Sequence, residues 1–259
     1  MTMNPSYKPP CLALENVQCD NRLQDISFTV RSGQCVHVVG ENGAGKTTLL
    51  LAMAGLLNNG TEGQIKLNNV DLRQYSLAQL ATSRCFLSQQ VSCQFDLTVA
   101  EILHFYTEVA RIPAEIEDAL ELSPLLAQSL LQLSGGEQQR VHIARCLLQI
   151  WPAIQRGEGV LLLDEPLQSL DVAHQQCLLQ LLSRLVAQGN VVVMSCHDVN
   201  TSYHHASHVA LLLNGQMIAS GQSKSVLTPN NLKTTLKCDF HLIYSENAYE
   251  FLLPVVNKP

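Results

Sequence analysis

The sequence predicts an α/β protein whose core is a largely parallel sheet with helices on both faces. Short apolar runs with the character of buried strands alternate along the chain with helical patterns, and this alternation is typical of parallel sheets. A glycine-rich turn also follows one of the strand-like runs and precedes a helical stretch, as at the ligand crevice of doubly wound sheets. The 259 residues suffice for one large domain or two small ones.

The first part of the chain is expected to supply strands around one helix. Its strands are expected where apolar residues alternate with polar ones or form short unbroken runs. They cover residues 12–17, 26–30, 35–39, 64–67 and 85–88. The glycine-rich turn at residues 40–45 leads into a helix predicted over residues 46–57, which an Asn-Asn-Gly sequence then ends.

Residues 96–150 change to a helical pattern, and strand-like runs return beyond them. Strands are expected at residues 160–163 and 191–194, with a helix over 172–188 between them. An Asn214-Gly215 turn predicts a hairpin of residues 209–213 and 217–218.

The helical stretch lies between two segments of the sheet, so it is predicted to be an inserted subdomain within one domain of residues 1–259. The core is assigned to residues 1–91 and 153–228, the helical subdomain to 92–152 and a C-terminal extension to 229–259.

Composition excludes several classes of protein. The 16 Lys and Arg residues against 22 Asp and Glu give a net charge of -6, so no nucleic-acid partner is expected. The nine cysteines include no Cys-x-x-Cys pair, which argues against a disulfide framework or a zinc site of usual spacing. No run of 18 apolar residues and no secretory signal is found, so no membrane span is expected.

Residues 40–47 read Gly-Glu-Asn-Gly-Ala-Gly-Lys-Thr and fit the phosphate-loop pattern G-x-x-x-x-G-K-[ST]. Glycines let several backbone N–H groups point at one anion, and the start of the following helix favours a phosphate there. Lys46 is expected to bind the β- and γ-phosphates, and the Thr47 hydroxyl to bind Mg²⁺. The candidate nucleotide-binding residues are Gly40, Glu41, Asn42, Gly43, Ala44, Gly45, Lys46, Thr47 and Thr48.

Two carboxylates follow the apolar strand expected at residues 160–163. Asp164 would face the same crevice as the phosphate loop, because the carboxyl ends of parallel strands meet at one edge. A carboxylate at that place can hold Mg²⁺ directly or through water. Glu165 points elsewhere, toward the site of an attacking water, where a general base is useful.

A second glycine motif, Leu-Ser-Gly-Gly-Glu at residues 133–137, precedes an apolar helix. Ser134 and Glu137 have the spacing of a capping box, which alone would explain them. Gly135 and Gly136 also expose the amides of the helix start, so the motif is a candidate for a second anion site.

With Leu-Ser-Gly-Gly-Glu between a phosphate loop and Leu-Leu-Leu-Asp-Glu, nearly the whole chain resembles the nucleotide-binding subunits of ABC (ATP-binding cassette) transporters. Three further landmarks of that family have matches. Gln89 matches the glutamine loop that joins the core to the helical subdomain, Asp171 matches the D-loop, and His197 matches the switch histidine.

The resemblance implies a P-loop NTPase (RecA-like) core with an N-terminal antiparallel β subdomain and an inserted helical signature subdomain, using ATP and Mg²⁺. It implies a homodimer in which Ser134, Gly135, Gly136 and Glu137 of one copy face the ATP held by the other. It makes Glu165, His197 and Gln89 the catalytic residues. Asp171 would reach the opposite phosphate loop, and Thr47, Gln89 and Asp164 would hold Mg²⁺.

The family also implies partners and a location. Two membrane-spanning permease subunits would bind this subunit at the cytoplasmic face of the bacterial inner membrane, where it is peripheral, and a periplasmic binding protein would act with it indirectly. The permease contact is expected near residues 90–106, with Phe95, Leu97 and Phe105 as candidates. These three side chains could equally belong to the core of the helical subdomain.

Within the family, the chain is most similar to the ATP-binding subunits of bacterial vitamin B12 (cobalamin) importers. The similarity lies in segments 161–173, 195–200 and 227–232, in the long connection at 149–159 and in the lack of an aromatic residue between Glu15 and Leu23. An aromatic residue there usually stacks on adenine, and the Arg22 guanidinium is an alternative. Iron-siderophore and haem importers, and a non-transport ABC ATPase such as one for iron-sulfur assembly, remain alternatives.

Overall fold

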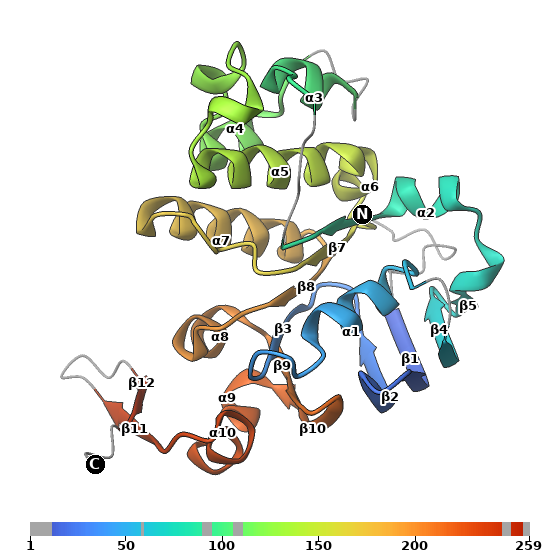
Figure 1. Cartoon of the computed structure of the whole chain (residues 1–259), viewed down its shortest axis with the longest axis vertical. Helices are drawn as coiled ribbons and strands as arrows, with labels where there is room; N and C mark the ends of the chain where they lie inside the picture. Colours follow the sequence, from blue (N-terminus) through green and yellow to red (C-terminus); the bar gives the residue numbers. More distant parts are fainter. Residues whose placement is uncertain (1–11, 58–59, 90–94, 106–110, 245–249, 256–259) are drawn as a thin grey trace, which may run out of the picture.

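The computed structural model describes residues 12–57, 60–89, 95–105, 111–244 and 250–255. Its largest sheet has the strand order β10-β9-β3-β8-β7-β6 (Figure 1). Five of these strands run parallel, and β10 pairs antiparallel with β9 at one edge. The strands cover Cys35–Val39 (β3), Arg84–Leu87 (β6), Val160–Leu163 (β7), Val191–Ser195 (β8), His208–Leu213 (β9) and Gln216–Gln222 (β10).

A smaller antiparallel sheet of order β2-β1-β4-β5 lies beside the main sheet, on the right of Figure 1. Its strands cover Leu12–Cys19 (β1), Leu23–Val30 (β2), Thr61–Leu67 (β4) and Val70–Asp71 (β5). Helix α1 (Lys46–Met53) contacts β1 and β4 as well as β7 and β8. The predicted α/β fold with a parallel sheet and an N-terminal antiparallel subdomain is confirmed.

The main sheet divides the apolar core into two layers. Leu161 and Leu163 of β7 join the cluster formed with α5 and α7, whereas Val160 and Leu162 join the cluster formed with α1 and the antiparallel sheet. Successive side chains of a strand point to opposite faces, and all four of these are buried. Burial on both faces explains why β7 is an unbroken apolar run rather than an alternating one.

Helices α3, α4, α5 and α6 enter the chain between β6 and β7, two strands that are neighbours in the sheet. In Figure 1 the first three of them gather at the top, above α7. Their bounds are Val99–Phe105 (α3), Ala114–Leu120 (α4), Gly135–Gln149 (α5) and Trp151–Gln155 (α6), with 3₁₀ turns at Ser123–Leu125 and Leu130–Gln132. The predicted boundary between residues 91 and 92 lies outside the described residues.

The remaining helices complete the core and the C-terminal part. They are α2 (Leu77–Ser83), α7 (Val172–Ala187), α8 (Val199–His205), α9 (Ser223–Val226) and α10 (Pro229–Leu236), and a 3₁₀ turn covers Leu72–Gln74. The chain then forms a separate hairpin of β11 (Phe240–Tyr244) and β12 (Glu250–Pro254). The Asn200 side chain of α8 exchanges two hydrogen bonds with the backbone of Leu252, which attaches this hairpin to the core.

Helix α1 is shorter than the predicted span of residues 46–57. Gly55 takes a left-handed conformation with φ of 62°. Its N–H donates to the Ala52 carbonyl, and the N–H of Leu56 donates to the Leu51 carbonyl, at 2.9 and 3.0 Å. This is the Schellman arrangement that ends helices at a glycine, so α1 stops at Met53.

Four neighbouring parallel strands end at the same edge of the main sheet. The segments that follow β3, β8, β7 and β6 begin at Gly40, Cys196, Asp164 and Ser88. The carboxyl edge of such a sheet is where α/β proteins bind ligands. The fold therefore brings the phosphate loop, Gln89, the two carboxylates and His197 to one edge.

Candidate nucleotide-binding and hydrolysis site

The phosphate loop joins β3 to α1 through backbone conformations that suit glycine. Gly43 and Gly45 have φ values of 80° and 103°, and Gly45 is the N-cap of α1. A Cβ atom at Gly45 would lie 2.8 Å from the Arg22 carbonyl oxygen. Only glycine therefore fits here without strain, which leaves the amides at the start of α1 facing the loop.

Lys46 is folded into the loop that it follows. Its Nζ donates hydrogen bonds to the carbonyl oxygens of Gly40 and Glu41 at 2.8 and 3.0 Å. Burial lowers the pKa of Lys46, while the nearby carboxylates of Glu165 and Asp164 oppose that shift. The ammonium group is thus held at the loop by two carbonyl oxygens, beside two acidic side chains.

Asp164 is a buried carboxylate held by two hydroxyl groups. The Thr47 hydroxyl donates to its Oδ2 and the Ser195 hydroxyl to its Oδ1, both at 2.6 Å. Asp164 is 1 % exposed. The structure thus brings the phosphate loop and the end of β7 together, at a cluster of hydroxyl and carboxylate oxygens.

Glu165 lies next to Asp164, but its side chain takes different partners. Gln89 Nε2 donates to Glu165 Oε2 at 2.9 Å, and His197 Nε2 contacts Glu165 Oε1. The Glu165 backbone has a positive φ of 50°, and its N–H donates to the Ser195 hydroxyl at 2.8 Å. A glutamine, a glutamate and a histidine from three different strand ends therefore meet at one point.

Lys46, Thr47, Gln89, Glu165 and His197 line one cavity of about 750 Å³, and the buried Asp164 lies behind Thr47. The cavity is bounded by Arg22, Asn42, Gly43, Gly45, Lys46, Thr47, Thr48, Gln89, Glu165, Gln168 and His197. Most of the residues named from the sequence as candidates for ATP binding and hydrolysis are in this set. Arg22, the alternative partner for adenine, also lines the cavity, and Gln168 is an addition that the motifs did not identify.

The signature motif and the D-loop line a different cavity, of about 400 Å³. Ser134 caps α5 in the predicted capping box: its Oγ accepts from the Glu137 N–H at 3.4 Å, and Glu137 Oε2 accepts from the Ser134 N–H at 2.8 Å. A Cβ atom at Gly136 would lie 2.7 Å from the Ser169 carbonyl oxygen, so glycine allows the two loops to touch. The cavity residues are Ser134, Gly136, Glu137, Arg140, Ser169, Leu170, Asp171 and His174.

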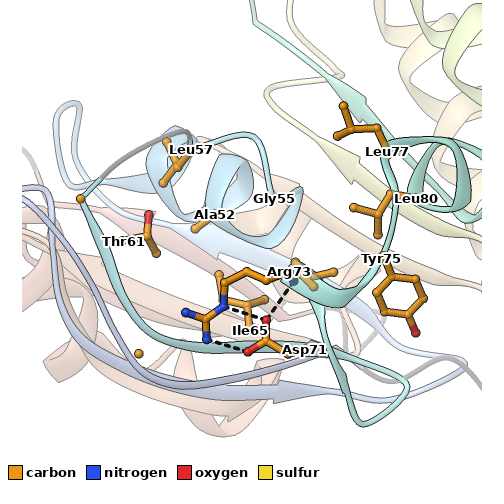
Figure 2. Close-up of a pocket in the computed structure, with 13 residues that line it drawn as sticks. Ala52, Gly55, Leu57, Thr61, Ile65, Asp71, Arg73, Tyr75, Leu77 and Leu80 are labelled. Atoms are coloured by element: carbon orange, nitrogen blue, oxygen red, sulfur yellow. Dashed lines mark hydrogen bonds and ion pairs between the residues drawn. The ribbon is translucent and has the colours of Figure 1, made fainter.

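A further hollow of about 470 Å³ lies between the C-terminal end of α1, strand β4 and α2, as Figure 2 shows. Its lining is mostly apolar, with Ala52, Ile65 and Leu80 among the side chains drawn. Arg73, the cation among the lining residues, is already bonded to the Asp71 carboxylate at 2.6 Å. This hollow therefore lacks the groups that a triphosphate needs, and none of the motif residues line it.

Two contacts of the site were not identified from the sequence. Ser195, the last residue of β8, bonds both Asp164 and the backbone of Glu165. Lys237, just beyond α10, forms an ion pair of 2.6 Å with Glu41 of the phosphate loop. A serine at the end of an apolar strand is only a weak sequence signal for the Ser195 contacts. No sequence pattern predicts the Lys237–Glu41 ion pair.

Comparison with known proteins gives one consistent answer. A family model described as ABC transporter matches residues 23–168. The vitamin B12 import ATP-binding protein BtuD of Shigella boydii is 40% identical over 250 residues, which cover 94% of this chain and 98% of that protein.

Solved structures agree on the fold. The ATP-binding subunit of an ABC transporter has a TM-score of 0.72 at 24% identity, covering 83% of this chain and 91% of its own. A dimeric ATP-binding cassette in a post-hydrolysis state with ADP and Pi has a TM-score of 0.67 at 24% identity, covering 82% and 98%. The chain therefore belongs to the ABC transporter family and is one of its ATPases.

Proposed function

We propose that this ABC ATPase binds ATP with Mg²⁺ in the 750 Å³ cavity and works as a homodimer that drives the import of vitamin B12 through two permease subunits. The main observation in favour of ATP hydrolysis is that Glu165 is held between Gln89 and His197, beside the phosphate loop. The similarity over nearly the whole chain to a vitamin B12 import protein supports vitamin B12 as the transported substrate.

The donor set at the phosphate loop fits Mg²⁺. Thr47 and Asp164 offer a hydroxyl and a carboxylate within 2.6 Å of each other, and Gln89 adds an amide oxygen nearby. Oxygen ligands of this kind are those that Mg²⁺ prefers. When bound, the ion would neutralise charge on the β- and γ-phosphates, and Thr47, Asp164 and Gln89 are the residues that would hold it.

Hydrolysis needs a water aimed at the γ-phosphate and a group to accept its proton. Glu165 is the candidate base, since its carboxylate is aimed into the cavity from the end of β7. Gln89 and His197 bond its two oxygens and so fix its orientation. Lys46, with the backbone amides of residues 43–47, would bind the phosphates from the other side.

The separation of the two cavities supports a homodimer. Ser134 and Asp171 line one cavity and Lys46 lines the other, so a nucleotide on one chain does not meet its own signature motif. A second copy turned through a twofold axis would place its signature helix over that nucleotide. Two ATP molecules would then be shared between two copies, and their hydrolysis would release the closed state.

Apolar side chains on the helical insert support a permease-docking surface. Phe95, Leu97 and Phe105 are 71 %, 39 % and 83 % exposed, so they are not the core of the subdomain. Gln90 and Tyr106, the ends of the predicted contact segment, lie outside the described residues. In the part of the chain that the structure covers, no helix has the length and apolar character to cross a bilayer. In the proposal this chain is peripheral, at the cytoplasmic face of the bacterial inner membrane.

Growth and hydrolysis together test the proposal. A strain lacking this chain should stop growing when cobalamin is limiting, and the parent chain should restore growth, whereas the Lys46→Ala chain should not. The chain purified with its permease subunits should release phosphate from ATP. If the chain restores uptake of an iron-siderophore or haem but not of cobalamin, the proposed substrate is wrong. If the complex has no ATPase activity, the proposed role in driving transport is wrong.

A further inference from the structure

His174 lies in the first turn of α7, three residues after the D-loop carboxylate Asp171. Its backbone N–H donates to Asp171 Oδ1 at 2.8 Å, which is an ordinary helix cap. Its ring adds a second link, because Nδ1 lies 3.0 Å from both carboxylate oxygens of Asp171. These two bonds from His174 lower the pKa of Asp171.

The other ring nitrogen of His174 faces the helical insert. Nε2 is buried and makes no hydrogen bond, and it lies 3.6 Å from Glu121 Oε2. Glu121 is the C-cap of α4 and has a left-handed backbone with φ of 45°. The imidazole thus stands between a carboxylate of the core and a carboxylate of the insert, with the second bond just outside hydrogen-bonding distance.

Arg140 extends this row of charges to the signature helix. Its Nη1 lies 4.0 Å from Glu121 Oε2 and donates to the Leu120 carbonyl at 2.8 Å. Arg140 is on α5, the helix that Ser134 caps. A continuous row, Asp171–His174–Glu121–Arg140, therefore joins the D-loop to the signature helix.

We propose that His174 is a positioning residue of the ATPase: it sets the D-loop against the signature helix, so that Asp171 and Ser134 reach the partner copy's nucleotide together. This inference rests on the proposed homodimer. A cap alone does not account for the geometry, because the backbone N–H supplies the cap with any residue at position 174, whereas the contacts to Asp171 and Glu121 use both ring nitrogens.

Both ring nitrogens carry hydrogen only in the protonated imidazole, so only that form donates to the two carboxylates together. Two carboxylates contact the ring, Asp171 from the start of α7 and Glu121 from α4, while Arg140 and Glu137 of α5 line the same cavity.

The test uses the full chain, with hydrolysis-blocked Glu165→Gln as background for measuring ATP-dependent dimerisation and the unblocked chain for kinetics. His174→Gln keeps the cap and one donor, His174→Ala removes the ring, and His241→Ala alters an exposed histidine of β11 as a control. We expect His174→Ala to weaken dimerisation and lower kcat by roughly tenfold, with the KM for ATP unchanged, as for the loss of a charge-assisted hydrogen bond. The dimerisation and kcat of His174→Gln should lie between those of the parent and those of His174→Ala.

Two readouts separate positioning from simple folding. Adding Glu121→Gln to His174→Ala should cause no further loss, because both act through one link. His174→Gln should recover part of the kcat that His174→Ala loses, because its amide can still donate to Asp171. Urea unfolding of each variant checks the fold, and His174→Gln carries the test if His174→Ala is unstable.

Equal kcat and dimerisation for the parent, His174→Ala and His241→Ala would overturn the inference while the proposed function stands. Full additivity with Glu121→Gln, or a His174→Gln variant with no more activity than His174→Ala at equal stability, would overturn it as well. A parent chain that neither hydrolyses ATP nor dimerises would instead refute the proposed function.

Discussion

At the scale of single residues, the site depends on how the carboxylates at the end of β7 are held. Asp164 accepts hydrogen bonds from two hydroxyl groups, whereas Glu165 is held by an amide and an imidazole. The positive φ of Glu165 turns the chain between them. The two adjacent acids therefore point to different partners, which suits one for the metal and the other for the water.

Glu165→Gln should keep ATP binding and stop hydrolysis. The amide is nearly the same size as the carboxylate but cannot accept a proton, so the rate of phosphate release should fall by roughly 10²–10⁴-fold. Because the phosphate loop is untouched, the KM for ATP should stay within twofold or so of the parent, and size-exclusion chromatography with ATP should show a stable dimer. Turnover at the parent rate would mean that another group is the base.

Ser195→Ala should show how much the hydroxyl at the end of β8 matters. It removes the donor to Asp164 and the acceptor of the Glu165 N–H in a buried place. We expect a loss of about 1–3 kcal/mol in unfolding free energy, measured in urea, and a fall in kcat. Ser220→Ala, at an exposed position of β10, is the control. Parent stability and parent kcat in Ser195→Ala would show that water replaces the hydroxyl.

Sequence patterns identify the motif residues that gather at one cavity, but they do not identify the side chains that hold those residues in place. The phosphate loop, the carboxylate pair and the signature capping box have fixed spacings that follow from the geometry of their chemistry, so spacing alone is enough to recognise them. Ser195 has no motif, since one serine after an apolar run has many roles. The Lys237–Glu41 ion pair joins residues far apart in the chain, so only the fold brings them together.

At the scale of elements, burial decided what could be predicted. Strands β3 and β7 were predicted at their true limits because both faces are buried and the apolar run has no gaps. Helices α2 and α6 were missed because they are too short to show a helical period. The first is fixed by a capping box of Ser76 and Gln79, and the second by packing of the buried Trp151.

The buried Asn190 side chain adds hydrogen bonds to the apolar contacts that hold the long connection at residues 149–159. Asn190 is fully buried, and its Oδ1 accepts from the Gly159 N–H at 2.8 Å. Its Nδ2 donates to the carbonyls of Ile154 and Leu185 at 3.1 and 2.9 Å. This side chain therefore ties the end of α6 and the start of β7 to α7.

Asn190→Ala should destabilise the chain without changing nucleotide affinity. The substitution leaves the buried Gly159 N–H without its acceptor and removes one donor from the Ile154 and Leu185 carbonyls, which keep backbone partners. We therefore expect a loss of about 1–3 kcal/mol in unfolding free energy, measured in urea. The KM for ATP should not change at a temperature where the variant stays folded, since Asn190 does not line the nucleotide cavity. The exposed neighbour Gln188→Ala is the control. Parent-like stability of Asn190→Ala would show that the connection is held by its apolar contacts alone.

At the scale of the whole molecule, the two groups of residues proposed to enclose one nucleotide line separate cavities of the chain. Lys46 and Glu165 line one cavity, and Ser134 and Asp171 line another. The fold was predicted from patterns along one chain, but a composite site needs a second copy, and no pattern in a single sequence states how two copies meet. The separation of the cavities supplies that argument.

Ser134→Arg should therefore spare nucleotide binding and prevent closure. The new guanidinium would fill the space at the start of α5 that the partner's γ-phosphate needs, while the phosphate loop of the same chain is unchanged. In the Glu165→Gln background, the ATP-dependent dimer should disappear from size-exclusion chromatography, while the binding of a fluorescent ATP analogue persists. Ser76→Arg is the matched control, since Ser76 caps α2 in the same kind of capping box but lies outside the signature cavity. If both variants dimerise like the parent, each chain completes its own site, and the shared arrangement is wrong.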